Sequence, residues 1–441
     1  MKRLWKVIPP CYSDVHGFMA VINETDGMGL VDDPSRYNKV SVGGEGGREG
    51  HGGKGGHGSG RGGRGGRGHD RSASFGRSER ISGMAGVSKE APRSCDPSQH
   101  PPEGMRVTHT GIRDSDIIRG TENKVRTAFT EDTAYFHPAF VLLAKAPSSS
   151  MIGSDLGTVA DDLNMESNIP VGSVDIDGEK DYLYGVSITL EAMGRLLLAP
   201  AKTIPGTVNL LGCNPIDWST ETLENVKTLL QDEGYKVHTV WGMRETAERL
   251  RTGAAASVNL AVNVAGLRLA KYMQQEYGIP YVVGAPFGKA ETERILSELR
   301  TPEGETARPS GSDTEPEVLI IGEQLTANAI RSAMDAHSWY GIRVLSFFEM
   351  NRTLMAPGDA KLTSEDQLAA QLKAPSVRLV IGDPDYKPLA DRNLPWIDLP
   401  NPGSMFSVEQ VKRVDLTGDR LGPWIVQGQE LALKELSEDR K

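Results

Sequence analysis

Short apolar runs alternate with longer amphipathic segments over most of the chain. The runs Ala139–Lys145 and Thr207–Gly212 predict buried strands, and the second is followed by a helical pattern with an N-cap at Ser219 and a C-cap at Gly234. Further strands are predicted within 235–241, 256–263, 278–288, 317–323, 340–350, 377–385 and 393–400, and helices over 243–252, 265–277, 325–337 and 364–373. This alternation predicts parallel sheets with helices on both faces.

The strand–helix cycle repeats along the chain. Its breaks fall near Pro205 and in the polar segment Thr301–Glu317, which reads as a linker. The pattern therefore predicts an α/β protein of three doubly wound, Rossmann-like domains. Their expected bounds are 1–205, 206–312 and 313–441, the last including a C-terminal helix.

One segment, residues 43–104, departs from this pattern. Of the 26 residues from Gly43 to Gly68, 16 are glycine, and Ser, Arg and Pro dominate the remainder, so we expect a flexible insertion that cannot bury a core. Three interpretations stay open. The stretch Arg61–Gly68 resembles arginine–glycine repeats that contact RNA; His51, His57 and His69 form a weak candidate metal site; or the segment is a tolerated surface insertion.

Composition narrows the function classes. The net charge of −10 does not favour nucleic acid or anionic lipid as a partner. The three cysteines, Cys11, Cys95 and Cys213, are odd in number and far apart, which favours a reducing compartment, and we expect the cytoplasm. We expect no signal peptide and no membrane span, because no apolar run reaches 18 residues. Phosphate-binding glycine patterns are lacking, so we expect no nucleotide on this chain.

A serine-rich turn follows the strand Ala139–Lys145 and leads into a helical pattern. Hydroxyls at the start of a helix usually cap it, and this is the interpretation favoured for Ser148, Ser149 and Ser150, with hydrogen bonding to an anion or to cluster sulfides as the alternative. Asp155 is expected in the first helical turn, where the helix dipole favours a carboxylate.

Several stretches in the same order resemble the nitrogenase component 1-type oxidoreductase family. They are Cys11–Asn38, Ser115–Phe129, and the segments 146–159, 169–178, 208–212, 278–292 and 421–432. The resemblance implies a three-domain fold, pairing with a homologous subunit and an iron–sulfur cluster at the interface. It also implies an ATP-driven iron–sulfur reductase as electron donor and a substrate or second cofactor held between the domains.

The resemblance assigns three cluster-facing positions to this chain. They correspond to Cys11, Tyr37 and Pro147, with Ser148 and Ser149 beside the last. Thiolate suits iron–sulfur chemistry, whereas tyrosine is a poor cluster ligand and proline has no donor. Either a partner supplies three cysteines and Cys11 the fourth ligand, or the cluster has been lost. The alternative for Cys11 is a small buried hydrophobic residue, which is also favoured for Cys95 and Cys213.

We therefore expect one subunit of a nitrogenase-like oxidoreductase, in a heterodimer or heterotetramer that shares an iron–sulfur cluster and reduces a small molecule. Four segments at predicted carboxyl ends of strands are expected to line the substrate pocket: 175–182, 212–217, 284–288 and 382–387. The competing hypothesis is a non-catalytic scaffold or assembly homologue, handling a metal through the His/Gly-rich segment.

Overall fold

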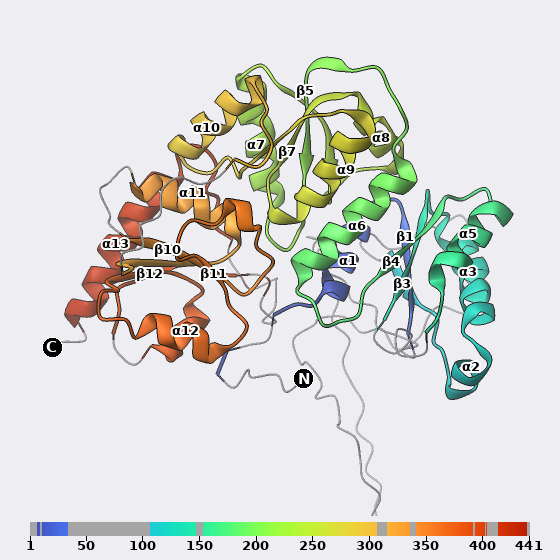
Figure 1. Cartoon of the computed structure of the whole chain (residues 1–441), viewed down its shortest axis with the longest axis horizontal. Coiled ribbons are helices and arrows are strands. Elements are labelled where there is room, and N and C mark those ends of the chain that lie inside the picture. The colour runs from blue at the N-terminus through green and yellow to red at the C-terminus, as the bar shows by residue number, and fades with distance from the viewer. Residues whose placement is uncertain are drawn as a thin grey trace, which may run out of the picture.

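The computed structural model describes residues 7–8, 11–33, 106–146, 153–306, 315–335, 341–390, 393–401, 403 and 413–438. Within these ranges the chain forms three parallel sheets with helices packed around each, seen as three lobes in Figure 1. The predicted fold class, α/β with three doubly wound units, is confirmed. No helix in the described ranges is both long enough and apolar enough to cross a membrane.

The first sheet has four parallel strands in the order β2-β1-β3-β4. The strands are β1 (Met28–Asp32), β2 (Val107–His109), β3 (Val141–Lys145) and β4 (Val171–Asp175), and the helices are α1 (Asp14–Ile22), α2 (Asp114–Arg119), α3 (Glu122–Phe136), α5 (Leu156–Glu166) and α6 (Tyr182–Leu197). Met28 and Leu30 pack on the side of α3 and α5, whereas Val31 packs with Phe18 of α1. Apolar side chains on both faces explain why these strands read as continuous apolar runs.

The second sheet has four parallel strands in the order β6-β5-β7-β8, and the third has five in the order β11-β10-β9-β12-β13. The second unit contains β5 (Ile204–Leu211), α7 (Thr220–Asp232), β6 (Lys236–Trp241), α8 (Ala247–Arg251), β7 (Ala256–Ala261), α9 (Leu267–Tyr277), β8 (Tyr281–Val283) and α10 (Lys289–Arg300). The third contains β9 (Val318–Ile321), α11 (Gln324–Asp335), β10 (Ile342–Ser346), β11 (Ala360–Lys361), α12 (Glu365–Leu372), β12 (Leu379–Gly382), β13 (Trp396–Asp398) and α13 (Leu421–Glu438). Helix α13 packs against β13 and α11, at the outer side of this lobe in Figure 1.

Helices α1 and α6 approach so closely that their backbones touch. A Cβ added to Gly185 would lie 2.0 Å from the carbonyl oxygen of Asp14, and one added to Gly17 would lie 2.0 Å from the carbonyl oxygen of Tyr182. Only glycine fits at these two positions. The contact fixes the start of α1, and with it the Cys11 segment, against the start of α6.

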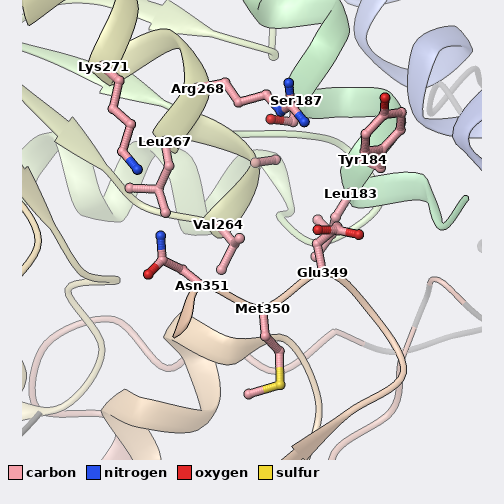
Figure 2. A pocket seen from close by; sticks show the side chains of 11 residues that line it. Leu183, Tyr184, Ser187, Val264, Leu267, Arg268, Lys271, Glu349, Met350 and Asn351 are labelled. Atoms are coloured by element: carbon pink, nitrogen blue, oxygen red, sulfur yellow. The ribbon is translucent and has the colours of Figure 1, made fainter. Parts of the chain in front are cut away.

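Two cavities lie between the units: the first is lined by residues of all three, the second by residues of the second and third. The larger, about 150 Å³, lies between α6, the start of α9 and the loop after β10, and we call it the Arg268 cavity (Figure 2). The smaller, about 80 Å³, lies between the loop after β5 and the loop after β9, and we call it the Asp217 cavity. One hydrogen bond links the two cavities. The backbone N of Val264, which lines the Arg268 cavity, donates to Oε1 of Glu323, which lines the Asp217 cavity, at 3.3 Å.

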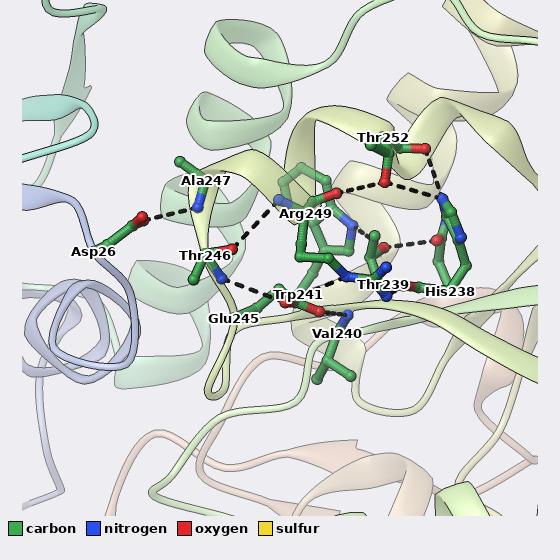
Figure 3. A network of polar contacts seen from close by, with 11 residues as sticks. Asp26, His238, Thr239, Val240, Trp241, Glu245, Thr246, Ala247, Arg249 and Thr252 are labelled. Atoms are coloured by element: carbon green, nitrogen blue, oxygen red, sulfur yellow. Dashed lines mark hydrogen bonds and ion pairs between the residues drawn. The ribbon is translucent and has the colours of Figure 1, made fainter.

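The helix expected over 243–252 is much shorter in the structure. Arg244 has a left-handed backbone (φ 48°), so α8 begins only after Thr246, whose side chain accepts a hydrogen bond from the N–H of Arg249. Figure 3 shows the polar contacts that replace the missing turn: Glu245 Oε2 accepts from the N–H of Val240 at 3.3 Å, and Arg249 donates to the carbonyl of His238. The predicted helix was therefore too long at its start, because the residues before Ala247 belong to the connection between β6 and α8.

Two predicted helix caps also need correction. Ser219 caps α7 as predicted, but the C-cap is Glu233, and Gly234 follows it with φ 86°. Asp155 is the N-cap of α5 rather than a first-turn residue, and it accepts from the N–H of Thr158. The cap of α5 is thus Asp155, while Ser148, Ser149 and Ser150 lie outside the described residues.

Candidate functional site

Cys11 lies on a short extended segment between the first and third units. The backbone N of the next residue, Tyr12, donates to the carbonyl of Gly403 at 2.7 Å, and the carbonyl of Tyr12 accepts from the N–H of Tyr182 at 3.0 Å. The Cys11 side chain is partly buried and packs against the apolar cores of both units. The segment therefore places the thiol at the boundary between these units.

The surroundings of Cys11 favour the neutral thiol. Burial raises its pKa to about 12, and the negative charges of Asp181 and Asp383 act in the same direction. Asp181 caps α6 and pairs with Lys361 at 3.2 Å, so part of its charge is compensated. A thiolate here needs a nearby cation, such as a metal ion, to offset these carboxylates.

The carboxyl ends of β1 and β3 lie at one edge of the first sheet, the edge from which the predicted cluster-facing turns depart. Asp32, the last residue of β1, is buried and accepts hydrogen bonds from the hydroxyls of Thr110 at 2.8 Å and Thr121 at 2.9 Å. The Thr121 hydroxyl in turn lies 2.9 Å from that of Ser154. Burial raises the pKa of Asp32, while the two threonine bonds lower it. This edge is held together by its own hydrogen bonds.

Most of the other predicted site residues lie outside the described residues. These are Tyr37, Pro147, Ser148, Ser149, Ser150, Cys95, His51, His57 and His69, with the whole segment 43–104. Cys213 is described: it is fully buried in the apolar core at the end of β5, as the small-hydrophobic interpretation predicts. Burial raises the pKa of its thiol to about 12.

The described residues do not fit an iron–sulfur cluster held by this chain alone. Cys11 is a single thiol, and no group of three or more His, Cys, Asp or Glu side chains in the described ranges could hold a metal ion. Iron–sulfur clusters need several thiolate ligands. Among the described residues, Cys11 is the one thiol at a predicted cluster-facing position.

A second polar cluster joins all three units, and we call it the junction network. Tyr182, the first residue of α6, is fully buried, and its hydroxyl donates to Oδ1 of Asp217 at 2.5 Å. The side-chain amides of Asn214 and Asn263 donate to Oδ2 of Asp217 at 2.8 and 2.7 Å. Burial raises the pKa of Asp217, and these three bonds lower it. The network thus joins the start of α6 to the carboxyl ends of β5 and β7.

Glu323, at the carboxyl end of β9, contributes a second carboxylate to this network. It accepts hydrogen bonds from the backbone N of Val264 at 3.3 Å and of Thr326 at 2.8 Å. Burial, followed by the charge of Asp217, raises its pKa to about 7. Arg413 also lines the Asp217 cavity and donates to the carbonyl of Trp218 at 2.7 Å. The cavity is small and lined by two carboxyls and one guanidinium.

The structure brings together parts of the four segments expected to line a pocket. Segments 175–182 and 212–217 meet through the hydrogen bond between Tyr182 and Asp217. Phe287, from segment 284–288, lines the Asp217 cavity. Segment 382–387 does not line this cavity, but Asp383 accepts a hydrogen bond from the backbone N of Asn401, which does, and it also lies near Cys11. Sequence reasoning missed Glu323 and Arg413. Glu323 directly ends a predicted strand, a position at which such sheets bind ligands, and that signal could have identified it.

Comparison with protein families identifies the chain. A family model described as "Nitrogenase component 1 type Oxidoreductase" matches residues 91–348, more than half of the sequence. The chain belongs to this family. The resemblance found in the sequence is thereby confirmed, and the three-sheet architecture of this component 1-type chain agrees with it.

Curated relatives cover a shorter stretch of the component 1-type chain. A subunit of the light-independent protochlorophyllide reductase of Nostoc punctiforme is 26% identical over 204 residues, which cover 43% of this chain and 40% of the relative. The corresponding subunit of the Zygnema circumcarinatum enzyme is 27% identical over 197 residues, 42% of this chain and 38% of the relative. The chain thus matches about two-fifths of the length of these relatives.

Solved structures match the component 1-type chain over almost its full length. The structure titled "Nitrogenase Cp1 at pH 6.5" superposes with a TM-score of 0.65 at 12% identity, covering 100% of this chain and 96% of that one. "Nitrogenase Cp1 at pH 5" gives a TM-score of 0.56 at 15% identity, covering 98% and 89%. At these identities the likeness establishes the fold.

Proposed function

We propose that this chain is one subunit of a nitrogenase-like oxidoreductase and that it pairs with a homologous, cysteine-complete subunit. The observation that carries the proposal is the family match over residues 91–348, supported by a fold match along the whole chain. An ATP-dependent iron–sulfur reductase would deliver the electrons. The substrate is a small molecule, and the names of the relatives give reduction of protochlorophyllide as one instance of the chemistry.

In this proposal Cys11 gives one ligand to a cluster at the subunit interface, and the partner gives the others. A bound cluster would supply one-electron transfer. The described residues of this chain serve a different purpose, which is positioning. The Tyr12 backbone bonds to Gly403 and Tyr182 hold the thiol in place, and iron bound there would offset the negative charges of Asp181 and Asp383.

A second candidate function is a non-catalytic scaffold or assembly homologue without a cluster. The carboxylates beside Cys11 favour it, because they disfavour a thiolate unless a metal ion compensates them. In this case the thiol is part of the packing between the first and third units. Binding of a metal by the His/Gly-rich segment belongs to the same alternative.

Iron analysis of the purified complex separates the two. The chain is co-produced anaerobically with a cysteine-complete homologous subunit, and the visible spectrum and iron content of the complex are recorded for wild type, Cys11→Ala and Cys213→Ala. The cysteine of the control variant lies in the apolar core, away from the site. Iron that disappears in Cys11→Ala and stays in Cys213→Ala supports the shared cluster. A colourless complex without iron, or iron unaffected by Cys11→Ala, contradicts it.

A further inference from the structure

The Arg268 cavity has the chemistry of a binding site. Neither Cys11 nor a residue of the junction network lines it, although its lining residue Val264 bonds to Glu323 of that network. The cavity is formed by all three units: Tyr184 and Ser187 of α6, Arg268 and Lys271 of α9, and Asn351 from the loop after β10 (Figure 2). Its volume of about 150 Å³ equals that of an engineered protein cavity known to take up benzene. The cavity is therefore large enough for a small organic molecule.

Positive charge on α9 dominates one side of the cavity. Arg268 and Lys271 lie three residues apart, so they occupy the same face of the helix. Lys271 pairs with Glu305 at 2.7 Å, but the nearest carboxylate to Arg268 is that of Glu191 at 3.7 Å, too long for a hydrogen bond. Within the described part of the chain the Arg268 guanidinium donates no hydrogen bond, so its N–H groups are available to a ligand.

The one acidic side chain that lines the cavity is compensated from outside. The carboxylate of Glu349 pairs with Lys361 at 2.8 Å, and Lys361 does not line the cavity. Asn351 is held firmly, since its backbone N–H donates to Gln324 at 2.7 Å and its carbonyl accepts from the same side chain at 3.0 Å. Its side-chain amide nitrogen points towards α9 in Figure 2 and adds a further donor on this side.

Apolar side chains complete the cavity. Leu183, Val264 and Leu267 line it between the polar groups, whereas the side chain of Met350 points away from them. A ligand that fits needs an anionic end for the guanidinium and an apolar body for these side chains. A carboxylate matches the planar fork of arginine with two parallel hydrogen bonds, which a neutral amide cannot reproduce.

We propose that the Arg268 cavity binds a small organic carboxylate of about six to nine non-hydrogen atoms. Its carboxylate lies on Arg268, with Lys271 as the second cation, and its hydrocarbon part lies against Leu267 and Val264. The proposal goes beyond the oxidoreductase function and does not depend on it. A cluster-containing subunit and a cluster-free scaffold would bind the ligand equally.

Direct binding to the full-length chain tests the proposal. Isothermal titration uses benzoate and glutarate as probes, with benzamide as the uncharged match to benzoate. Arg268→Gln removes the charge from the cavity. Arg195→Gln is the matched control. Like Arg268, Arg195 pairs with Glu191, here at 2.7 Å, and its guanidinium lies over a tyrosine ring, Tyr272 for Arg195 and Tyr184 for Arg268. Unlike Arg268, Arg195 does not line the cavity.

We expect saturable binding of at least one of the two carboxylates to wild type and to Arg195→Gln. Affinity should fall roughly tenfold or more in Arg268→Gln, and benzamide should bind more weakly than benzoate by a similar factor. The proposal is overturned if neither carboxylate binds saturably, if Arg268→Gln binds as wild type does, or if benzamide matches benzoate. An equal loss in both arginine variants also overturns it, because the effect would then not come from the cavity.

Discussion

Replacing Glu323 with glutamine tests the electrostatics of the junction. Glu323 is buried, accepts two backbone hydrogen bonds, and faces the charge of Asp217, so its pKa is raised from 4.5 to about 7. Glutamine is the closest match to the protonated acid in size and in hydrogen-bonding groups. The variant therefore fixes the side chain in the neutral state that the junction favours.

The sign and size of the effect follow from proton linkage. Between pH 4.5 and about 7 the folded chain keeps the Glu323 proton while the unfolded chain has lost it. The free energy of unfolding therefore falls as the pH rises through this window, by about 1.4 kcal/mol per pH unit and about 3 kcal/mol in total. The contribution of Glu323 is fully present below pH 4.5 and absent above about pH 7. Glu323→Gln should remove this fall.

Urea unfolding followed by tryptophan fluorescence at pH 5, 6, 7 and 8 measures the difference. The amide NH2 of glutamine replaces an oxygen that accepts from Val264 or Thr326, which lowers the stability of the variant by the same amount at every pH. On top of this constant offset, we expect the variant to gain about 2 to 3 kcal/mol relative to wild type between pH 5 and pH 8. Glu221→Gln, an exposed change in the first turn of α7, is the control and should run parallel to wild type. Asp217 is present in both proteins, so the difference curve reports the titration of Glu323 together with its coupling to Asp217. An equal pH slope for Glu323→Gln and wild type would refute the reasoning.

Two further substitutions test packing. Arg331 and Asp359 form an ion pair of 2.5 Å, and their side chains are 3% and 0% exposed. Arg331→Met leaves the buried carboxylate of Asp359 without its cation, so the free energy of unfolding measured in urea should fall by about 3 to 5 kcal/mol. A loss below about 1 kcal/mol would contradict this. Gly185→Ala should cost about 1 to 3 kcal/mol or more, because its methyl group meets the backbone of α1. Gly422→Ala, where no atom lies within 4 Å, is the control, and equal melting temperatures for the two variants would disprove the close contact.

The strands were predictable because parallel sheets covered on both faces need continuous apolar runs. The runs Ala139–Lys145 and Thr207–Gly212 contain β3 and most of β5 for this reason. The cap at Ser219 was equally local, since a hydroxyl just before an amphipathic helix bonds to a free N–H of its first turn. The shortening of the predicted helix 243–252 could not be predicted locally, because it depends on the left-handed backbone of Arg244 and on contacts to the preceding strand.

The candidate sites depended on contacts between residues far apart in sequence. Asp217 meets Tyr182 and Asn263 at separations of 35 and 46 residues, and no local pattern encodes such pairings. Motif order led to Cys11, but the carboxylates that surround its thiol come from the start of α6 and from the loop after β12. Arg268 was overlooked because a lone arginine on an amphipathic helix normally faces solvent. The side chain of Arg268 is indeed half exposed, and only the fold shows that it lines one cavity with residues of α6 and of the loop after β10.

The N-terminal segment ties the beginning of the chain to its last third. The backbone N atoms of Val7 and Ile8 both donate to Oε1 of Glu365 at 2.8 Å, and Tyr12 bonds to Gly403. Ile8 and Glu365 are 357 residues apart, so during synthesis at about 5 to 20 residues per second the segment emerges roughly 20 to 70 seconds before its partner. Throughout this delay the Cys11 thiol lacks its third-unit neighbours, and the nascent chain presents it before the mature packing can form.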